Sequence, residues 1–251
     1  MCLSLTLPSA KGKKCIGFVL DEERNLYRNS SVDRHGLVEL DRNCISLEKV
    51  LVETANTLNT TGLDRVEDCL CLAVNLASSL LQLHGTPWLS ETWCNKCIYF
   101  SRLINIEQPY VMLKFGSSSQ SETCYPAFGP NPYLVALGIV LLELWERRSF
   151  DDWTKSRSNN SLPENHTLMD RAVAGIEWLR TAVTYPMADN EEYAKVVQRC
   201  LYSSLEPVQP SRELTNQGFH EAVYNQIVAP LERLYLTVTT TQLPMKVSAD
   251  H

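Results

Sequence analysis

Long apolar runs and basic clusters are both missing from this chain of 251 residues. The longest apolar run, Tyr133–Leu142, is about half the length needed to cross a bilayer, and Glu143 closes it. Lys and Arg number 23 against 29 Asp and Glu, and the longest basic stretch is Lys11–Lys14. The short apolar run predicts no membrane span. Because binding to phosphates needs an excess of cations, we also expect no nucleic-acid partner.

Cysteine is too sparse for a disulfide scaffold. Nine cysteines are spread over the chain, and an odd number cannot all pair with one another. The first residues, Met1–Pro8, carry no leading positive charge and make a poor secretory signal. We therefore expect reduced thiols and a cytoplasmic location. With 44% hydrophobic and 21% charged residues, the composition is that of an ordinary globular domain.

The spacing of apolar residues predicts a mainly helical (α+β) fold with a few short strands. Ser46 is a suitable N-cap for one helix, and Asp64 with Glu67 resembles a capping box for the next, which ends at His84. The predicted helices cover residues 47–58, 65–84, 133–145, 168–183, 191–202 and 219–235, and the predicted strands cover residues 15–20, 26–27, 36–40, 97–100 and 110–115.

Proline and polar segments mark the remaining boundaries. Asn131 and Pro132 supply an N-cap and a first helical residue for a helix that is apolar on almost every side. Pro230 is expected to kink or interrupt the last helix, and the polar segment 151–165 is expected to be an exposed loop. The predicted organisation is an N-terminal extension over residues 1–14, one domain over residues 15–236 and a flexible tail over residues 237–251.

The order of these elements resembles the C-terminal lobe of a eukaryotic protein kinase. Leu76–His84 (LASSLLQLH) resembles the kinase helix before the catalytic loop, and Leu137–Leu144 (LGIVLLEL) resembles the central buried helix. Val197–Leu201 (VQRCL) resembles the late helix that ends in x-x-C-L. The whole pattern, with truncated N-terminal strands, is similar to a fungal family of unknown function with degenerate kinase-like lobes. Some members of that family are joined to cell-death effector domains of the HeLo type.

The parts that phosphoryl transfer requires are nearly all missing. No G-x-G-x-x-G phosphate cover occurs, and the segment that resembles the catalytic loop contains Glu91 as its only carboxylate. Where the metal-binding D-F-G motif would lie, the sequence is Lys114-Phe115-Gly116, which places a cation where magnesium needs a carboxylate. We therefore expect a protein that is not an enzyme and uses no cofactor.

The resemblance implies a non-catalytic, pseudokinase-like module that binds another protein or regulates an effector. We expect the partner surface in segments 88–97 and 151–165. The alternative is an accessory enzyme or ligand-binding protein of a fungal secondary-metabolite pathway, with a remnant cleft near His84, Glu91 and Lys114. His84 is the last residue on the apolar face of its predicted helix, and that position is also typical of a packed core histidine.

Cys94 and Cys97 form a C-x-x-C motif that permits two further hypotheses. A zinc-stabilised scaffold would need Cys69 and Cys71 as well, but these lie two apart on a predicted helix and face opposite ways. A redox pair would need a helix N-terminus to lower a thiol pKa, whereas this motif enters a predicted strand. Cys94 and Cys97 are the metal candidates, and we predict no bound metal.

Overall fold

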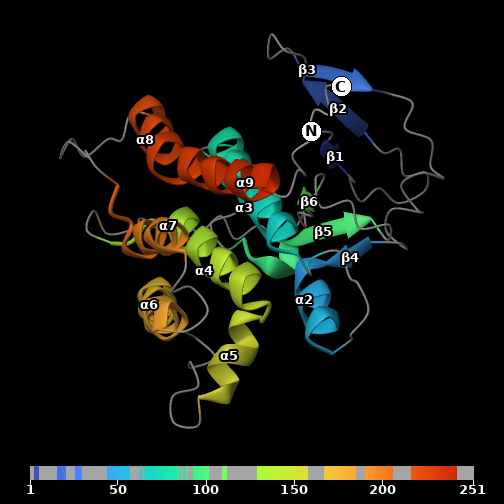
Figure 1. Cartoon of the computed structure of the whole chain (residues 1–251). Coiled ribbons are helices and arrows are strands. Elements are labelled where there is room, and N and C mark those ends of the chain that lie inside the picture. The colour runs from blue at the N-terminus through green and yellow to red at the C-terminus, as the bar shows by residue number, and fades with distance from the viewer. Residues whose placement is uncertain are drawn as a thin grey trace, which may run out of the picture.

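The computed structural model describes residues 3–5, 16–20, 26–29, 44–56, 63, 65–84, 86, 89, 93–101, 109–111, 129–157, 167–184, 190–205 and 216–241. These residues are mainly helical with two small sheets, as the sequence predicts (Figure 1). The helices are α2 Leu47–Asn56, α3 Val66–Leu83, α4 Pro132–Glu146, α5 Phe150–Ser156, α6 Leu168–Thr184, α7 Glu191–Tyr202, α8 Asn216–Val223 and α9 Ala229–Thr241, with a 3₁₀ turn at Asn95–Cys97 and a π-helical turn at Tyr224–Val228.

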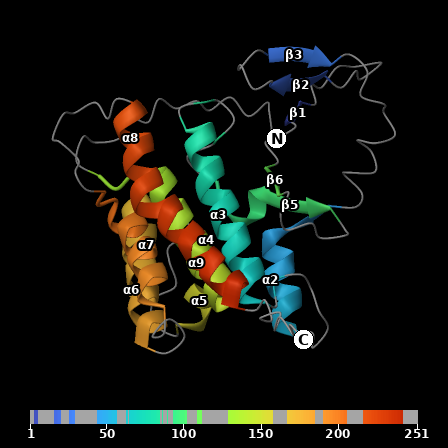
Figure 2. The same ribbon diagram turned by 45° about the horizontal axis from the view of Figure 1, so that its top comes forward.

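Two three-stranded antiparallel sheets lie on the same side of the helices (Figures 1 and 2). The strands are β1 Leu3–Leu5, β2 Ile16–Leu20, β3 Leu26–Asn29, β4 Cys44–Ser46, β5 Ile98–Ser101 and β6 Tyr110–Val111. The predicted hairpin is confirmed, and β1 pairs with β2 from within the predicted extension. The predicted strand at residues 36–40 and the end of that at residues 110–115 lie outside the described residues.

Helix α4 is the centre of the helical part, as its all-round apolar sequence predicts. It packs against α6 and α7 on one side and α3 on the other, and α9 crosses α3 (Figure 2). Two buried side chains bond carbonyls of α4 to its neighbours: the Tyr193 hydroxyl donates to the Leu141 oxygen at 2.8 Å, and the Cys69 thiol donates to the Leu144 oxygen at 3.4 Å. The Leu144 carbonyl is among the last four of the helix, which lack intrahelical donors, so the Cys69 contact also satisfies the backbone.

Helix α3 begins at Val66, with Arg65 at its N-cap position and no cap hydrogen bond from the Arg65 side chain. Glu67 forms an ion pair with Arg65, whose Nε lies 3.4 Å from the carboxylate. The capping box of Asp64 with Glu67 stays a prediction. Asp64 itself lies outside the described residues. By contrast, the predicted N-caps of α2 and α4 are confirmed, since Ser46 Oγ accepts the Lys49 N–H and Asn131 Oδ1 accepts two N–H groups.

The first part of the predicted loop 151–165 is helical. The Ser149 hydroxyl caps α5 by accepting the Asp152 N–H at 3.1 Å, and Trp153 stacks on Trp178 of α6 with ring centroids 5.2 Å apart. The sequence did not predict α5 because this helix is short and polar and has a weak local signal. Its stability depends instead on burying one aromatic face against the rest of the protein. Residues 158–165 lie outside the described residues.

Pro230 interrupts the last helix, as predicted, and a π-helical turn precedes it. Proline has no N–H to donate to the carbonyl four residues before it, which is that of Gln226. The Arg199 side chain of α7 donates to this oxygen at 3.0 Å and so replaces the missing hydrogen bond. The interruption therefore becomes a contact between α7 and the C-terminal helices.

The prediction that the chain frays from Thr237 is wrong for the first residues of that segment, because α9 continues to Thr241. Threonine hydroxyls here donate back to carbonyls one turn earlier, Thr237 to Arg233 at 2.8 Å and Thr240 to Leu236 at 2.6 Å. Such back-bonding lets threonine remain in a helix despite its branched side chain.

Within the described residues, α3 is the one helix long and apolar enough to cross a membrane by length and composition alone. Half of it is buried inside the protein, where it packs against α4 and α9. The core helix of a soluble protein has the same length and composition, so this finding is weak support for a span.

Gly138 allows α4 to approach α7 closely, so a side chain at this position is expected to destabilise the fold. A Cβ at this position would lie 2.9 Å from Leu201 side-chain atoms and 3.0 Å from Cys200 Cβ, which is held by its backbone. We expect Gly138→Ala to lower the free energy of unfolding by about 1–3 kcal/mol, despite a gain of about 1 kcal/mol in helix propensity. Urea unfolding measures the change.

Gly175→Ala in α6 is the matched control. Its Cβ would meet Leu201 Cδ2 at 2.8 Å, but this is the mobile end of a side chain. We expect a smaller loss of stability than for Gly138→Ala. A stabilising effect of Gly138→Ala would show that α4 and α7 are not held at this separation.

Candidate functional site

Only His84, of the three residues of the predicted remnant cleft, lies within the described residues. It follows the last turn of α3, where its N–H donates to the Leu80 oxygen at 2.8 Å. Its ring stacks on Phe219 of α8 with centroids 4.1 Å apart and meets the edge of Tyr133 of α4 at 5.1 Å. His84 thus joins three helices by ring packing, while Glu91 and Lys114 lie outside the described residues.

His220 of α8 is the second histidine in this cluster, with its ring centroid 6.1 Å from that of His84. Among the described residues, His84 Nδ1 and His220 Nε2 are buried and have no hydrogen-bond partner. Burial lowers the pKa of His84, and a positive charge on His220 lowers it further. The ring of His84 therefore favours its neutral form, which suits a packing contact.

Cys94 and Cys97 meet across the 94–97 turn, the name used here for residues Cys94 to Cys97. The Cys97 N–H donates to the Cys94 oxygen at 2.9 Å, and the two thiols are hydrogen-bonded to each other. Cys69 faces the core, where it donates to α4, so the four cysteines do not form the four-thiolate arrangement. Within the described residues, no group of three or more His, Cys, Asp or Glu side chains could hold a metal.

Asn95 of the 94–97 turn binds a carboxyl group inside the protein. Its Nδ2 donates to Glu143 Oε1 of α4 at 2.7 Å, and the Phe150 N–H of α5 donates to the same oxygen at 2.8 Å. Both side chains are buried, and Glu143 Oε2 has no partner among the described residues. Burial raises the pKa of Glu143 to about 8. The carboxyl group is thus protonated at neutral pH, and it positions the 94–97 turn and the start of α5.

Lys96, the next residue, connects the two segments in which the sequence predicts a partner surface. Its Nζ lies 2.7 Å from Asp151 Oδ2 of α5 and 3.5 Å from Glu48 Oε1 of α2. A partner surface in segment 88–97 requires exposed side chains, and Trp93 and Asn95 of that segment are instead buried. Exposed ion pairs contribute at most about 1 kcal/mol each, so the Lys96 pairs position α2 and α5 more than they stabilise them.

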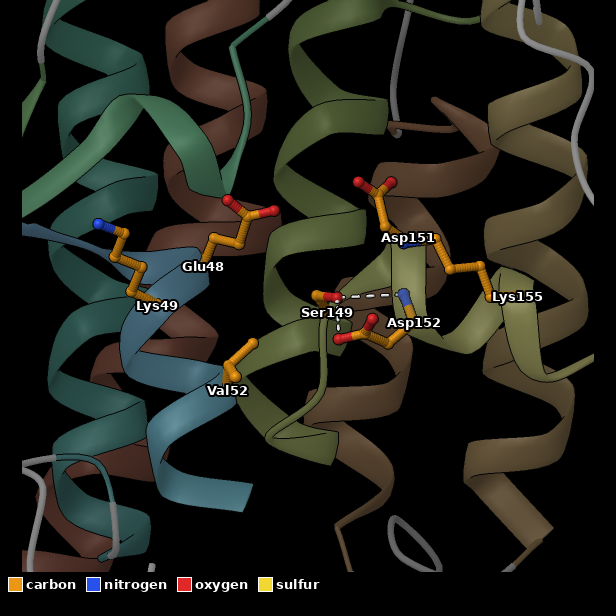
Figure 3. A pocket seen from close by; sticks show the side chains of 7 residues that line it. All are labelled: Glu48, Lys49, Val52, Ser149, Asp151, Asp152 and Lys155. Carbon is orange, nitrogen blue, oxygen red and sulfur yellow. Dashed lines mark hydrogen bonds between the residues drawn. The ribbon is translucent and has the colours of Figure 1, made fainter. Parts of the chain in front are cut away.

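A shallow pocket of about 220 Å³ lies between α2 and α5 (Figure 3). Its lining mixes charges, with carboxylates and ammonium groups from both helices, and the Ser149–Asp152 hydrogen bonds form one wall. The lining residues are Glu48, Lys49, Val52, Ser149, Asp151, Asp152 and Lys155. Because Val52 is the one apolar residue in this lining, the α2–α5 pocket is poorly suited to burying a small molecule.

A larger hollow of about 420 Å³, the α6–α7 groove, lies between the outer faces of α6 and α7. Its surface is mostly apolar, with three charged side chains in the lining. The lining residues are Ile176, Leu179, Arg180, Glu191, Ala194, Lys195, Gln198 and Tyr202. On the same face of α6 as Ile176, by helical spacing, Met169 and Val173 are 52% and 48% exposed. This groove offers more apolar surface than the α2–α5 pocket.

Sequence reasoning did not assign roles to Asn95, Lys96 or Glu143. The one signal for Glu143 was a carboxylate inside an otherwise apolar helix, and such a group must find partners when buried. Nothing local identified Asn95 as that partner, because 48 residues separate the two.

The comparisons with known proteins identify the family. A family model described as a domain of unknown function (DUF7580) matches residues 4–236. The chain belongs to this family. The DUF7580 match starts within β1 and ends within α9, so it contains the 94–97 turn and the α6–α7 groove. Searches of curated proteins and of solved structures gave no match.

The buried carboxyl group of Glu143 generates a prediction about pH. The unfolded chain releases this proton above the ordinary pKa of 4.5, whereas the folded protein keeps it until about pH 8. The contribution of Glu143 to stability is therefore complete below about pH 4.5 and is lost as the pH rises toward 8, by up to about 1.4 kcal/mol per pH unit. Glu143→Gln keeps an acceptor oxygen but does not titrate.

As the pH rises from about 5 to about 8, we expect the unfolding free energy of the wild type to fall relative to that of Glu143→Gln. Urea unfolding at several pH values measures this difference, and titrations common to both proteins cancel. A difference that stays constant with pH would mean that Glu143 is already ionised in the folded protein.

Proposed function

We propose that this DUF7580 chain is a non-catalytic module that binds another protein, and that the partner occupies the α6–α7 groove. The observation that carries the proposal is the exposed apolar stripe on α6. Met169 and Val173 lie four residues apart, on the same face of the helix as Ile176 of the groove, and Tyr202 of α7, which also lines the groove, is 47% exposed. Contiguous apolar side chains on a surface mark interaction sites more often than scattered ones do.

The shape and chemistry of the groove favour a partner helix. Two neighbouring helices present a hollow whose lining includes Ile176 and Ala194, and an amphipathic helix buries its apolar face in such a hollow. Arg180, Glu191 and Lys195 also line the groove, with Lys195 and Glu191 paired at 2.8 Å, so these charged side chains would meet polar residues of the partner. Tyrosine and arginine are also among the residues enriched at energetically important contacts.

The finer part of the proposal is that the module is a fungal, cytoplasmic, pseudokinase-like lobe that regulates an effector. The support comes from the sequence letters of Leu76–His84, Leu137–Leu144 and Val197–Leu201, and from the buried position of α4. The substitution of Lys114 at the place of a metal-binding carboxylate supports a non-catalytic role.

The test uses two variants on α6, Met169→Glu and Val173→Glu. The purified chain is immobilised, proteins are captured from a lysate of the source organism, and the affinity of each captured protein is measured by calorimetry. We expect a bound protein whose affinity falls about tenfold or more in each variant, because both place a charge in an apolar contact.

Leu236→Glu is the matched control, because Leu236 of α9 is 57% exposed but lies away from the groove. It should bind as the wild type does. Captured proteins that bind all three variants equally would place the interaction elsewhere and contradict the groove.

The alternative function, a ligand-binding or accessory protein with a remnant cleft, is favoured by one observation: the buried unpartnered nitrogens of His84 and His220. A thermal-shift titration with ATP and ADP, each with and without Mg²⁺, tests it. If the cleft binds nucleotide, Tm rises by several degrees at millimolar ligand, and His84→Ala reduces the shift. No shift at millimolar nucleotide would contradict a nucleotide-binding cleft at His84.

A further inference from the structure

The 94–97 turn holds two thiols in a geometry that suits a covalent bond between them. A turn closed by the Cys97 N–H and the Cys94 oxygen keeps the two Cα atoms within about 7 Å, close to the range that a disulfide spans. The thiols already touch through a hydrogen bond. We propose that Cys94 and Cys97 are a redox modification site that forms a reversible intramolecular disulfide.

Both cysteines are accessible to a small oxidant. Each is half-buried, and Lys96 between them is exposed, so the turn lies at the surface while Asn95 points into the core. Cys69 and Cys200, by contrast, are buried, and burial raises the pKa of Cys200. Accessibility therefore separates this pair from the core thiols.

The chemistry of the pair favours a stable disulfide that forms slowly. The hydrogen bond from Cys97, followed by burial, raises the pKa of the Cys94 thiol. A thiol that resists ionisation reacts slowly with an oxidant, because the thiolate is the attacking species. The same property leaves the reduced form without a stabilised thiolate, so the disulfide is not easily reversed by weak reductants.

The co-reactant is a low-molecular-weight disulfide such as oxidised glutathione. One protein thiol loses its proton and attacks a glutathione sulfur, and the mixed disulfide forms as one glutathione thiolate leaves. The second protein thiolate then attacks the protein sulfur of the mixed disulfide and expels the second glutathione thiolate. The two protons end on the two glutathione molecules, so the protein is oxidised by two electrons and glutathione disulfide is reduced by two.

The bond would fix a turn that connects three helices. Asn95, inside the closed loop, binds Glu143 of α4, and Lys96 binds Asp151 of α5 and Glu48 of α2. A disulfide reduces the conformations open to the unfolded chain and holds both side chains in their bonded positions. Oxidation therefore acts on the junction of α2, α4 and α5.

The experiment is oxidation of the native, full-length protein with millimolar oxidised glutathione, followed by blocking of the remaining thiols and tryptic digestion without reduction. Trypsin cuts after Lys96, so peptide 97–102 stays attached to peptide 66–96 only through a disulfide. Fragmentation of the attached pair then distinguishes Cys94 from Cys69 and Cys71. We expect a Cys94–Cys97 bond in most molecules, a rise in Tm of about 3–6 °C, and reversal of both by dithiothreitol.

Cys94→Ser and Cys97→Ser should abolish the rise in Tm, and Cys71→Ser, which changes another half-buried thiol, should leave it intact. Unfolding of the untreated variants shows that they are folded. Three outcomes would overturn the proposal: Cys94 and Cys97 remain thiols, either of them bonds instead to another cysteine, or oxidation needs prior removal of zinc that copurifies with the protein.

Discussion

The hydrogen bond from Asn95 to the buried carboxyl group of Glu143 is the contact on which the arrangement of the chain depends. An ionised carboxylate would be costly to bury, so Glu143 keeps its proton and accepts two hydrogen bonds on one oxygen. One comes from the 94–97 turn and the other from the start of α5. Because burying a polar group offsets much of what its hydrogen bonds contribute, the main result is position: both segments dock at one point of α4.

The opposite side of α4 is held mainly by close packing, beside the buried hydrogen bond from Tyr193 to the Leu141 carbonyl. Gly138 has no side chain, so Leu201 of α7 fills the space above it, and Gly175 of α6 accommodates the same leucine. One leucine thus sits among three helices. The inner faces of α6 and α7 are occupied by this packing, whereas Met169 and Val173 of α6 lie outside the core, 52% and 48% exposed.

Most helices could be predicted from the sequence because each has a local signal, a repeat of apolar residues with suitable caps. Helix α5 could not, since its aromatic face gains stability only against Trp178, far along the chain. The kink at Pro230 was predictable from proline chemistry, but its compensation by Arg199 was not. For the candidate site, the C-x-x-C motif was visible, whereas the contact of its two thiols and the Asn95–Glu143 bond depend on tertiary structure.

Helix α5 links the two surfaces to which we assign roles. Lys96 of the 94–97 turn binds Asp151 at one of its faces, and Trp153 stacks on Trp178 of α6 at the other. Trp178 is followed directly by Leu179 and Arg180, which line the α6–α7 groove. The contacts of α5 therefore extend from the 94–97 turn to the helix that lines the groove. Because coupling requires an element with two arrangements, these contacts couple the two surfaces only if α5 has a second docked position.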